Sequence, residues 1–578
     1  MELLAAIADR VARDPAAVAF EGPDGKRLDY GGLDARADAL AAGLRAHGVG
    51  PGRRVALMLP RSTDLFTAEL AVLRAGACYA PLDPDQPPER LARLLRAADS
   101  ALVLTEDPRR SEDAGLAAAA GVRAVSVPEL AAEPAGCAPE PEVGPQDPAC
   151  CLFTSGSTGF PTGVLISRAA LDAYTASYAG LVGCRPGERG AQLGSPGFDV
   201  TIDEIWPFLT TGATVVIAPD TAQAGPERLA EWLRAARVTT TYIPPLLLEA
   251  MFRTRPPLGE LRLVRTGGER LAAYPPPGFP CRVLNEYGPT ETVAGATTCD
   301  VSAWRERGVL PPIGRPLPHI TPSIRDERGA VVPRGEAGEL YLSGPTVSLG
   351  YLGDPERTAE KFVQLDGARW FRTGDLVREL PTGDLEFLRR ADDQVQLLGK
   401  RVDLGEVEQA VRAHPAVRRT AVVAPQDRFG RSDGLHCFVR WEPGADVDAP
   451  RLRAHLAAQL PAHLVPTAVH DVDDFPVTPA GKVDRRALLR RLAAARDRPE
   501  IELAGMVRLW EQVLGAAGLA PDDDFFRLGG TSALAVQLAA DAQQRWHRPV
   551  SARDVFTNPT PRALAGVLNG ADRRQEER

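Results

Sequence analysis

Short apolar runs alternate with Ala- and Leu-rich stretches along most of this chain, and this alternation limits the classes of fold that the chain can adopt. Residues 55–59 and 214–218 are apolar runs of strand length, whereas 33–47 and 227–237 have a helical composition. Strands that alternate with helices stack into α/β layers. Because one hydrophobic core rarely grows beyond ~250–300 residues, a chain of 578 residues should contain at least three folding units.

The pattern changes toward the C-terminus. Strands near 417–425 and 436–441 indicate a smaller α+β unit, and apolar residues from Ile501 to Leu514 recur at helical spacing, which predicts a small helical bundle. Residues 105–148, rich in Ala, Pro and Glu, are interpreted as a surface excursion. The predicted boundaries are a large lobe over 1–391, a small lobe over 392–490, a linker over 491–500, a helical domain over 501–572 and a tail over 573–578.

Composition excludes several classes of function. The net charge of −9, with no basic tract, argues against a nucleic-acid partner. No apolar stretch is long enough to span a bilayer, and the N-terminus lacks the pattern of a signal peptide. The eight cysteines show no zinc-site spacing, so we expect reduced thiols and a cytoplasmic protein.

Lysine is scarce in this arginine-rich chain. The only lysines are Lys26, Lys361, Lys400 and Lys482. The guanidinium of arginine is planar and spreads its charge over several nitrogens, whereas the ammonium of lysine is a compact point charge. A lysine kept in such a chain is therefore a candidate for a role that arginine cannot fill.

The segment LFTSGSTGFPTGV, residues 152–164, is the most informative local pattern. Glycines allow consecutive backbone N–H groups to converge on an anion, and hydroxyl side chains add donors. The segment lacks the GK[ST] of a Walker A loop. On its own it suits a flexible turn as well as a phosphate loop. The residues that would cradle the phosphates of ATP are Thr154, Ser155, Gly156, Ser157, Thr158 and Gly159.

Further motifs follow this segment in a fixed order. With it, the series over residues 25–490 resembles the amino-acid adenylation domains of nonribosomal peptide synthetases, which belong to the adenylate-forming superfamily with acyl-CoA ligases and luciferases. The resemblance implies an α/β fold with a large N-terminal lobe and a small α+β lobe. The motifs are NEYGPTE (285–291), GELYLSG (338–344), FRTGD (371–375), RRADDQVQLLGKRVDLGEVE (389–408), LPAHLVP (460–466) and AGKVDR (480–485).

The resemblance also implies roles for individual residues. Lys482 matches a mobile catalytic lysine that approaches the substrate carboxylate and the α-phosphate, and Glu291 matches the carboxylate that holds Mg²⁺. Asp392 matches a hinge between the lobes. Lys400 and Arg401 match a loop that swings toward the carrier arm. The remaining ATP contacts implied by the resemblance are Tyr287 against adenine, Thr290, Asp375 on the ribose hydroxyls, and Arg390.

Two positions depart from the family pattern. The family usually reads P-K-G after the phosphate loop, but Thr162 stands here in place of the lysine. Because backbone amides make most of the phosphate contacts, we expect weaker ATP affinity and retained activity. Arg389 occupies a position that is usually glycine, and nothing in the sequence explains it.

The resemblance also places a pocket for the amino acid. Asp199 matches the anchor of the substrate α-ammonium, which aryl-acid and fatty-acid activators generally lack. The pocket is rich in polar groups, so we predict a side chain that donates hydrogen bonds, neutral or cationic, with an acidic side chain held by Arg265 as the alternative. The predicted lining is Val200, Asp203, Tyr242, Arg265, Gly267, Glu286, Ala294 and Gly295.

The segment DDFFRLGGTSALAVQLA, residues 523–539, resembles a carrier-protein signature. Such a domain is a small four-helix bundle that bears covalent phosphopantetheine on a serine at the start of a helix. Ser532 is the predicted attachment site, although the neighbouring hydroxyl of Thr531 competes with it. A serine that only caps the helix is the structural alternative.

These features predict an enzyme that activates an amino acid with ATP and loads it onto its own carrier as a thioester. Two other interpretations are a ligase that releases a CoA thioester and a degenerate module that acts as a scaffold. Condensation and thioesterase segments are not recognisable in the sequence, so delivery in trans is expected. The expected partners are a phosphopantetheinyl transferase and a downstream synthetase or tailoring enzyme. The need for an MbtH-like helper protein stays open.

Overall fold

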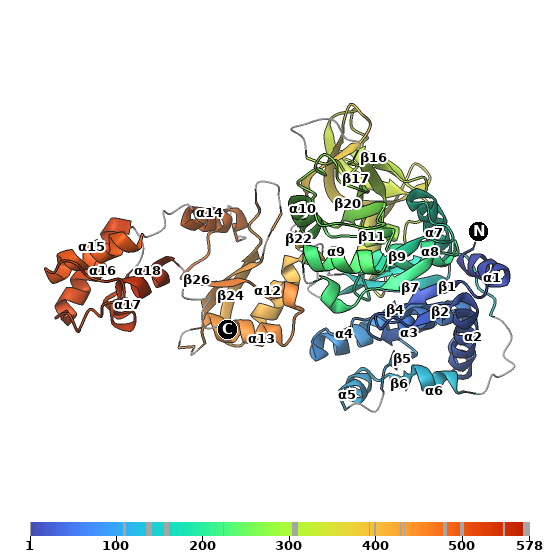
Figure 1. Ribbon diagram of the computed structural model, residues 1–578, viewed down its shortest axis with the longest axis horizontal. Helices are drawn as coiled ribbons and strands as arrows, with labels where there is room; N and C mark the ends of the chain where they lie inside the picture. Colours follow the sequence, from blue (N-terminus) through green and yellow to red (C-terminus); the bar gives the residue numbers. More distant parts are fainter. Residues whose placement is uncertain are drawn as a thin grey trace. The chain divides into compact units, whose positions relative to one another are not determined.

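The chain divides into two compact units, Met1–Arg485 and Arg486–Arg578. We describe them from a computed structural model (Figure 1). The residues that it describes are 2–107, 111–133, 141–154, 161–223, 225–302, 310–391, 394–397, 400–427, 431–432, 434–442, 444–445, 447–477, 483–496, 502–546 and 550–569.

A seven-stranded sheet forms one layer of the first unit. Its order is β18-β8-β7-β4-β3-β5-β6, parallel from β7 to β6 and antiparallel at β7-β8 and β8-β18. The strands are β3 (Arg54–Met58), β4 (Cys78–Pro81), β5 (Leu102–Thr105), β6 (Arg123–Ser126), β7 (Pro148–Thr154), β8 (Thr162–Ser167) and β18 (Gly350–Tyr351).

A nine-stranded sheet forms the second layer, in the order β15-β14-β13-β12-β11-β9-β10-β1-β2. Its middle, from β13 to β1, is parallel, so those strands end at one edge. The strands are β1 (Val18–Glu21), β2 (Arg27–Asp29), β9 (Arg189–Gln192), β10 (Thr214–Ile217), β11 (Thr240–Tyr242), β12 (Leu263–Gly267), β13 (Arg282–Tyr287), β14 (Thr297–Asp300) and β15 (Arg315–Pro316).

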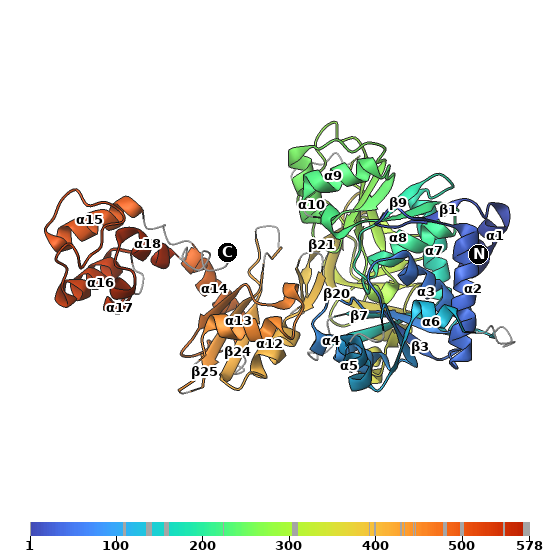
Figure 2. The ribbon, with the colours of Figure 1, turned by 60° about the horizontal axis from the view of Figure 1, so that its bottom comes forward.

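Helices pack against these sheets, and α9 and α10 lie side by side over one end of the second sheet (Figure 2). The helices are α1 (Leu3–Arg13), α2 (Tyr30–Ala46), α3 (Thr63–Arg74), α4 (Pro88–Ala98), α5 (Ser111–Ala120), α6 (Val127–Ala131), α7 (Arg168–Val182), α8 (Val200–Leu209), α9 (Pro226–Ala235), α10 (Pro245–Thr254) and α11 (Pro355–Lys361).

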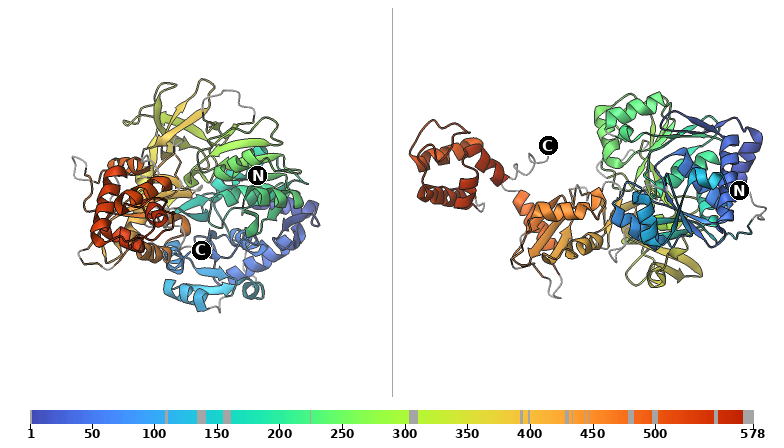
Figure 3. Two further views of the ribbon diagram at one scale, coloured as in Figure 1. Left: turned by 60° about the vertical axis from the view of Figure 1, so that its left-hand side comes forward. Right: turned by 90° about the horizontal axis from the view of Figure 1, so that it is seen from below.

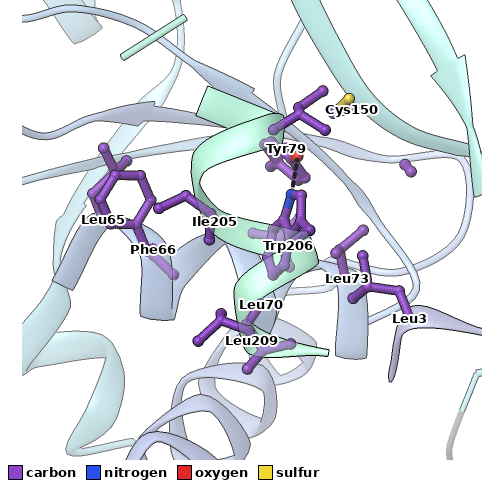
Figure 4. Close-up of a cluster of buried hydrophobic side chains, with 14 of the residues drawn as sticks. Leu3, Leu65, Phe66, Leu70, Leu73, Tyr79, Cys150, Ile205, Trp206 and Leu209 are labelled. Carbon is purple, nitrogen blue, oxygen red and sulfur yellow. Dashed lines mark hydrogen bonds between the residues drawn. The ribbon is translucent and has the colours of Figure 1, made fainter. Parts of the chain in front are cut away.

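Helices α3 and α8 form the apolar centre of the large lobe. Leu65, Phe66 and Leu70 of α3 lie against Ile205 and Trp206 of α8 (Figure 4). The indole Nε1 of Trp206 donates to the Tyr79 hydroxyl of β4 at 3.2 Å, which satisfies the one polar group of that buried ring. Apolar burial of this kind is the main stabilising contribution to the lobe.

The rest of the first unit is smaller. An antiparallel sheet contains β16 (Thr321–Arg325), β17 (Ala337–Ser343), β19 (Phe362–Leu365), β20 (Ala368–Glu379) and β21 (Leu385–Arg390). The α+β part after it contains β22 (Gln394–Leu397), β23 (Lys400–Asp403), α12 (Leu404–Arg412), β24 (Val417–Val423), β25 (His436–Trp441), α13 (Ala449–Ala457) and β26 (Ala468–Asp471). Helix α14 (Arg485–Arg496) leads into the second unit.

Besides α14, which the second unit includes from Arg486 onward, the described part of this unit contains four helices that pack around one another (Figure 3). They are α15 (Leu503–Leu514), α16 (Ser532–Trp546), α17 (Ala552–Thr557) and α18 (Pro561–Asn569). Their core is centred on Trp510, which is fully buried and meets the Phe525 ring edge to face at 5.0 Å. The predicted α/β lobe, smaller α+β lobe and helical bundle are therefore confirmed.

Residues 105–148 differ from the prediction. The sequence suggested a surface excursion, but the segment contains α5, β6 and α6, and β6 extends the seven-stranded sheet beside β5. Buried Val125 and Leu130 join the core of the lobe, which the Ala- and Pro-rich composition concealed. Across the described ranges, no helix combines the length and the apolar character needed to cross a membrane.

We expect Trp510→Ala to unfold the second unit locally. Removal of this buried ring leaves a cavity, and such changes cost about 3–5 kcal/mol. Hydrogen exchange measured by mass spectrometry on the full chain should show faster exchange in peptides from 503–514 and 532–546. Trp510→Phe, which keeps a ring at this position, should lose much less protection. Unchanged exchange in Trp510→Ala would contradict this account of the core.

Candidate active site

A cavity of about 570 Å³ lies where the parallel strands of the nine-stranded sheet end. In open α/β sheets, ligands bind beyond the carboxyl ends of the strands. The cavity wall is formed by residues at or just after the ends of β9, β10, β11, β12 and β13 and by the start of α8. The residues of these strand ends that line it are Leu193, Gly194, Ala218, Pro219, Tyr242, Pro244, Gly267, Gly268, Glu286 and Tyr287.

All predicted pocket residues except Arg265 line this cavity. They come from α8, from three strand ends and from the segment after the GPTE motif. The lining members are Asp199, Val200, Asp203, Tyr242, Gly267, Glu286, Ala294 and Gly295. The phenol of Tyr242 donates to the backbone carbonyl of Gly267 at 2.7 Å, so this hydroxyl is held against β12.

Arg265 lies behind the cavity wall and is 1% exposed. Its Nη1 lies 3.4 Å from Oδ2 of Asp203 and 3.9 Å from Oε2 of Glu286. The same Nη1 donates to the Tyr178 hydroxyl at 2.5 Å, and its guanidinium carbon lies 5.2 Å from the centroid of that ring. The guanidinium is thus shared between both acidic residues of the pocket.

Two tyrosines of α7 complete this network, and the sequence reasoning missed them. Tyr174 donates to Oδ1 of Asp203 at 2.7 Å and accepts from the Gly295 N–H at 2.9 Å. Tyr178 donates to Oε2 of Glu286 at 2.6 Å, and the two rings stack 5.2 Å apart. Their spacing of four residues puts them on one helix face. Buried aromatic residues without a functional role show the same spacing, so the spacing alone does not identify these two tyrosines.

Burial sets the electrostatics of the network. Loss of solvent raises the pKa of Asp203 well above its usual range, although the Arg265 charge opposes this. Burial likewise raises the pKa of Glu286, with Arg265 and the Tyr178 hydroxyl opposing it. Within the described part of the chain, Oε1 of Glu286 has no hydrogen-bond partner.

Asp199 stands at the entrance of α8 and lines the same cavity. Its Oδ2 accepts a short hydrogen bond from the hydroxyl of Thr290, in the GPTE motif. The contact fixes the carboxylate relative to the strand end of β13. The predicted ammonium anchor and one predicted ATP contact are therefore adjacent.

Tyr287, Asp375 and Arg390 form a second cluster. The Tyr287 hydroxyl donates to Oδ2 of Asp375 at 2.5 Å, and Nη1 of Arg390 donates to Oδ1 at 2.7 Å. Asp375 is buried, and Arg390 also donates to the Thr373 carbonyl at 3.1 Å. The structure therefore brings together three of the residues predicted to contact the nucleoside. A carboxylate can accept more than two hydrogen bonds, which is compatible with the predicted contact between Asp375 and the ribose hydroxyls.

Glu291 is fully buried in a short 3₁₀ turn (Thr290–Thr292). Its Oε1 accepts from the Tyr351 hydroxyl at 2.7 Å, and its backbone carbonyl accepts from the Ser348 N–H at 2.9 Å. No cluster of three metal-ligating side chains exists among the residues described. A single carboxylate suits Mg²⁺, which commonly takes its other oxygens from water and substrate phosphates. The chemistry of Glu291 therefore suits the ion, whereas its side chain is fully buried and does not line the cavity.

Several predicted residues lie outside the described chain: Ser155, Gly156, Ser157, Thr158, Gly159, Asp392 and Lys482. Thr154 ends β7, where it pairs with Thr162 of β8. The Arg401 side chain is also not described. Lys400 lines the cavity, and its Nζ lies 5.0 Å from the centroid of the Phe198 ring. Burial lowers the Lys400 pKa, an effect that Asp83 opposes.

Ion pairs join the two lobes. Arg90 of α4 makes a short ion pair with Glu406 of α12. Arg431 contacts both carboxylate oxygens of Glu249, of α10, at 2.9 and 2.8 Å. His463 is close to Lys400 and Arg90, and burial with these two charges lowers its pKa to about 3. A neutral His463 is therefore compatible with two neighbouring cations.

The second unit places the predicted attachment site at the first residue of α16. Gly529 adopts φ of 94°, which suits glycine, and the Gly530 N–H donates to the Phe525 carbonyl at 2.9 Å. The hydroxyl of Thr531 accepts from the Leu534 N–H at 3.3 Å, as a helix cap does. Thr531 thus already has a structural role next to Ser532.

The fold and these clusters define an adenylate-forming enzyme joined to a carrier domain. The model for AMP-binding enzymes matches residues 7–352, the AMP-binding enzyme C-terminal domain matches 406–482, and the phosphopantetheine attachment site matches 504–568. The chain belongs to the AMP-binding enzyme family and carries a phosphopantetheine attachment domain after its AMP-binding C-terminal domain.

Known proteins of this type align along the whole chain. A linear gramicidin synthase of Brevibacillus parabrevis is 37% identical over 99% of this chain and 8% of its own length. Phosphinothricin tripeptide synthetase PhsC of Streptomyces viridochromogenes is 37% identical over 98% of this chain and 53% of its own length. The chain thus spans about half or less of these curated relatives.

A solved structure matches nearly end to end. It is a holo nonribosomal peptide synthetase protein with adenylation and PCP domains, bound to a vinylsulfonamide inhibitor. The TM-score is 0.73 at 27% identity, and the match covers 99% of this chain and 98% of that one. The predicted family, fold and enzyme class are confirmed.

Arg265→Met should make folding stability depend more steeply on pH. A carboxyl group whose pKa is higher in the folded than in the unfolded state binds more protons when folded, so the unfolding free energy falls as pH rises. Loss of Arg265 removes the charge that opposes the raised pKa of Asp203 and Glu286. Between about pH 5 and 8, the variant should lose roughly 1–3 kcal/mol more than the parent chain, at about 1.4 kcal/mol per pKa unit.

Urea unfolding at both pH values measures this difference. Arg237→Met provides the control, because Arg237 forms an exposed ion pair with Glu260 away from the cavity. Parallel pH profiles for the Arg265→Met and parent chains would contradict the network described above.

Proposed function

We propose that this enzyme activates one amino acid with ATP, loads it onto Ser532 of its own carrier domain, and delivers it in trans to a separate protein. The observation that supports this most directly is the cavity, which contains Asp199 and a polar network, in a chain that also bears a carrier signature. The carboxylate of Asp199 lines the cavity at the mouth of α8, and an ammonium group is the partner of opposite charge that it would attract.

In the first half-reaction, a carboxylate oxygen of the amino acid attacks the α-phosphorus of ATP, and pyrophosphate leaves. We propose that Lys482 stabilises the negative charge that develops on the transferring phosphoryl group, and that Glu291 binds Mg²⁺. Asp375 and Arg390 would fix the ribose, and Tyr287 would lie against adenine. Phosphate contacts would come from Thr154, Ser155, Gly156, Ser157, Thr158, Gly159 and Thr290.

In the second half-reaction, the aminoacyl group leaves AMP for the carrier. Ser532 would hold phosphopantetheine, which supplies a thiol acceptor when bound. We assign the hinge between the two lobe orientations to Asp392, and the loop facing the carrier arm to Lys400 and Arg401. The position of Lys400 in the cavity wall supports that assignment.

The proposed domain bounds are 1–391 and 392–490 for the lobes, 491–500 for the linker and 501–572 for the carrier, with a tail to 578. The carrier domain implies a phosphopantetheinyl transferase as partner. We propose a downstream synthetase or tailoring enzyme as the recipient of the aminoacyl group.

We further propose that the substrate side chain is polar, donates hydrogen bonds, and is neutral or cationic. Arg265 is held by Asp203, Glu286 and Tyr178 and does not line the cavity, which weighs against an acidic side chain. Glu286 lines the cavity, and its Oε1 is unsatisfied within the described part of the chain. It would accept from the substrate.

Ser532→Ala should separate the two half-reactions. Pyrophosphate exchange that depends on an amino acid should stay within about twofold, because adenylation precedes and does not need the carrier arm. Covalent loading should be lost after treatment with a phosphopantetheinyl transferase and coenzyme A. Thr531→Ala, the matched control, should keep the mass of the phosphopantetheine adduct. An adduct on the Ser532→Ala chain would assign the site to Thr531.

A pyrophosphate-exchange panel over the common amino acids and several nonproteinogenic ones should rank donor-bearing side chains first. Glu286→Gln should lower kcat/KM for a cationic best substrate by about tenfold to a hundredfold, because it removes a charged hydrogen-bond acceptor. Glu260→Gln, on an exposed ion pair, should leave kcat/KM unchanged. A preference for aliphatic or unsubstituted aromatic side chains would refute this substrate class.

A further inference from the structure

Among the residues that the structure describes, Arg357 is a buried cation without a carboxylate partner. It lies in the first turn of α11 and is 7% exposed. Its Nη1 donates to Oγ1 of Thr162 at 2.9 Å, and its guanidinium carbon lies 4.7 Å from the centroid of the Tyr351 ring. Its Nε is buried and has no hydrogen-bond partner in the described part of the chain.

Several other arginines in the interior of this unit pair with a carboxylate, whereas Arg168 and Arg369 donate to backbone carbonyl oxygens. Arg265, Arg325, Arg390 and Arg431 each form an ion pair with an aspartate or glutamate. The Arg357 guanidinium has no such pair among the described residues, and its one side-chain hydrogen bond there goes to a neutral hydroxyl, while the Arg357 backbone N–H donates to the capping Asp354. A buried guanidinium is costly unless an anion approaches it. Its surroundings therefore indicate a site for an anion.

The location of Arg357 identifies the anion. Thr162 of β8 pairs with Thr154 of β7, and these two strand ends flank the glycine- and hydroxyl-rich segment in the sequence. Tyr351, on whose ring Arg357 rests, donates to Glu291 at 2.7 Å. Arg357 thus lies between the start of the proposed phosphate contacts and the proposed Mg²⁺ carboxylate. Both neighbours point to the polyphosphate of ATP.

We propose that Arg357 supplies the positive charge that the family lysine would bring at position 162, and that it acts on the β- and γ-phosphates of ATP. The charge has moved from strand β8 to helix α11, and the hydrogen bond between Thr162 and Arg357 joins the two positions. This inference rests on the proposed function. It replaces the expectation that the loss of the lysine weakens ATP binding.

Four variants test the exchange of charge between the two positions. Arg357→Met removes the charge and keeps the side-chain length, and Arg357→Lys keeps the charge. Thr162→Lys is made alone and together with Arg357→Met. Arg325→Met is the matched control, because Arg325 is also a buried arginine over aromatic rings, but it pairs with Asp366 in another sheet.

Isothermal titration calorimetry with MgATP, pyrophosphate and AMP, without any amino acid, reads out binding directly. Arg357→Met should weaken MgATP and pyrophosphate by about tenfold or more, as expected when a charged hydrogen bond is lost. AMP, which lacks the β- and γ-phosphates, should change by less than about twofold. Arg357→Lys and the double variant should recover most of the MgATP affinity. Thr162→Lys alone should gain none, because it places two cations together.

Other results would overturn the proposal. Equal weakening of AMP and MgATP by Arg357→Met would make the residue a structural link between β8 and α11. A loss of MgATP affinity in Arg325→Met would show that the effect is not specific to Arg357. A double variant that does not recover MgATP affinity would show that the charge at position 162 cannot replace that of Arg357. Either result would contradict the proposal. If Arg357→Met does not fold, Arg357→Lys decides, because a structural link through the planar fork would not survive that change. These measurements need no amino-acid substrate, so a failure of the proposed activity would show separately in pyrophosphate exchange.

Discussion

The large lobe depends on the burial of helix α8 between its layers. Every residue from Thr201 to Leu209 is buried, including Asp203 and Glu204. Glu204 accepts from the N–H groups of Leu193 and Gly194, which ties the helix to the end of strand β9. The apolar side of the helix enters the core through Trp206, and its first turn faces the cavity. Core packing and the geometry of the site are therefore set by one element.

The sequence was sufficient for the parts of the fold that follow from local patterns. Apolar periodicity located helices and strands, as with the helix around Trp510, and ordered motifs located Tyr287, Asp375 and Glu291. Composition failed where a strand is short and its neighbours are alanines. Strand β6 is one such case, since its role comes from pairing with β5 and from no property of its own residues.

The pocket shows what motifs alone cannot supply. Position in the motifs identified Asp203 and Glu286, but the roles of Tyr174 and Tyr178 depend on how α7 crosses the sheet. Arg265 was predicted among the residues that line the pocket, yet it lies behind the wall, where its guanidinium pairs with Asp203 and Glu286. Which side of a strand end faces a cavity is a tertiary property. A single sequence does not encode it in any local signal.

The shared guanidinium also constrains how this pocket can change over evolutionary time. Loss of Arg265 alone would leave two buried carboxylates together, and loss of both acids would leave a buried cation. A mutation that neutralises Glu286 keeps one negative charge opposite one positive charge. Because Arg265 lies closer to Asp203 than to Glu286, paths from this pocket to an apolar specificity should begin at Glu286, with Asp203 and Arg265 replaced later and as a pair. The order of mutations in such a lineage is fixed by charge balance before any selection on the substrate.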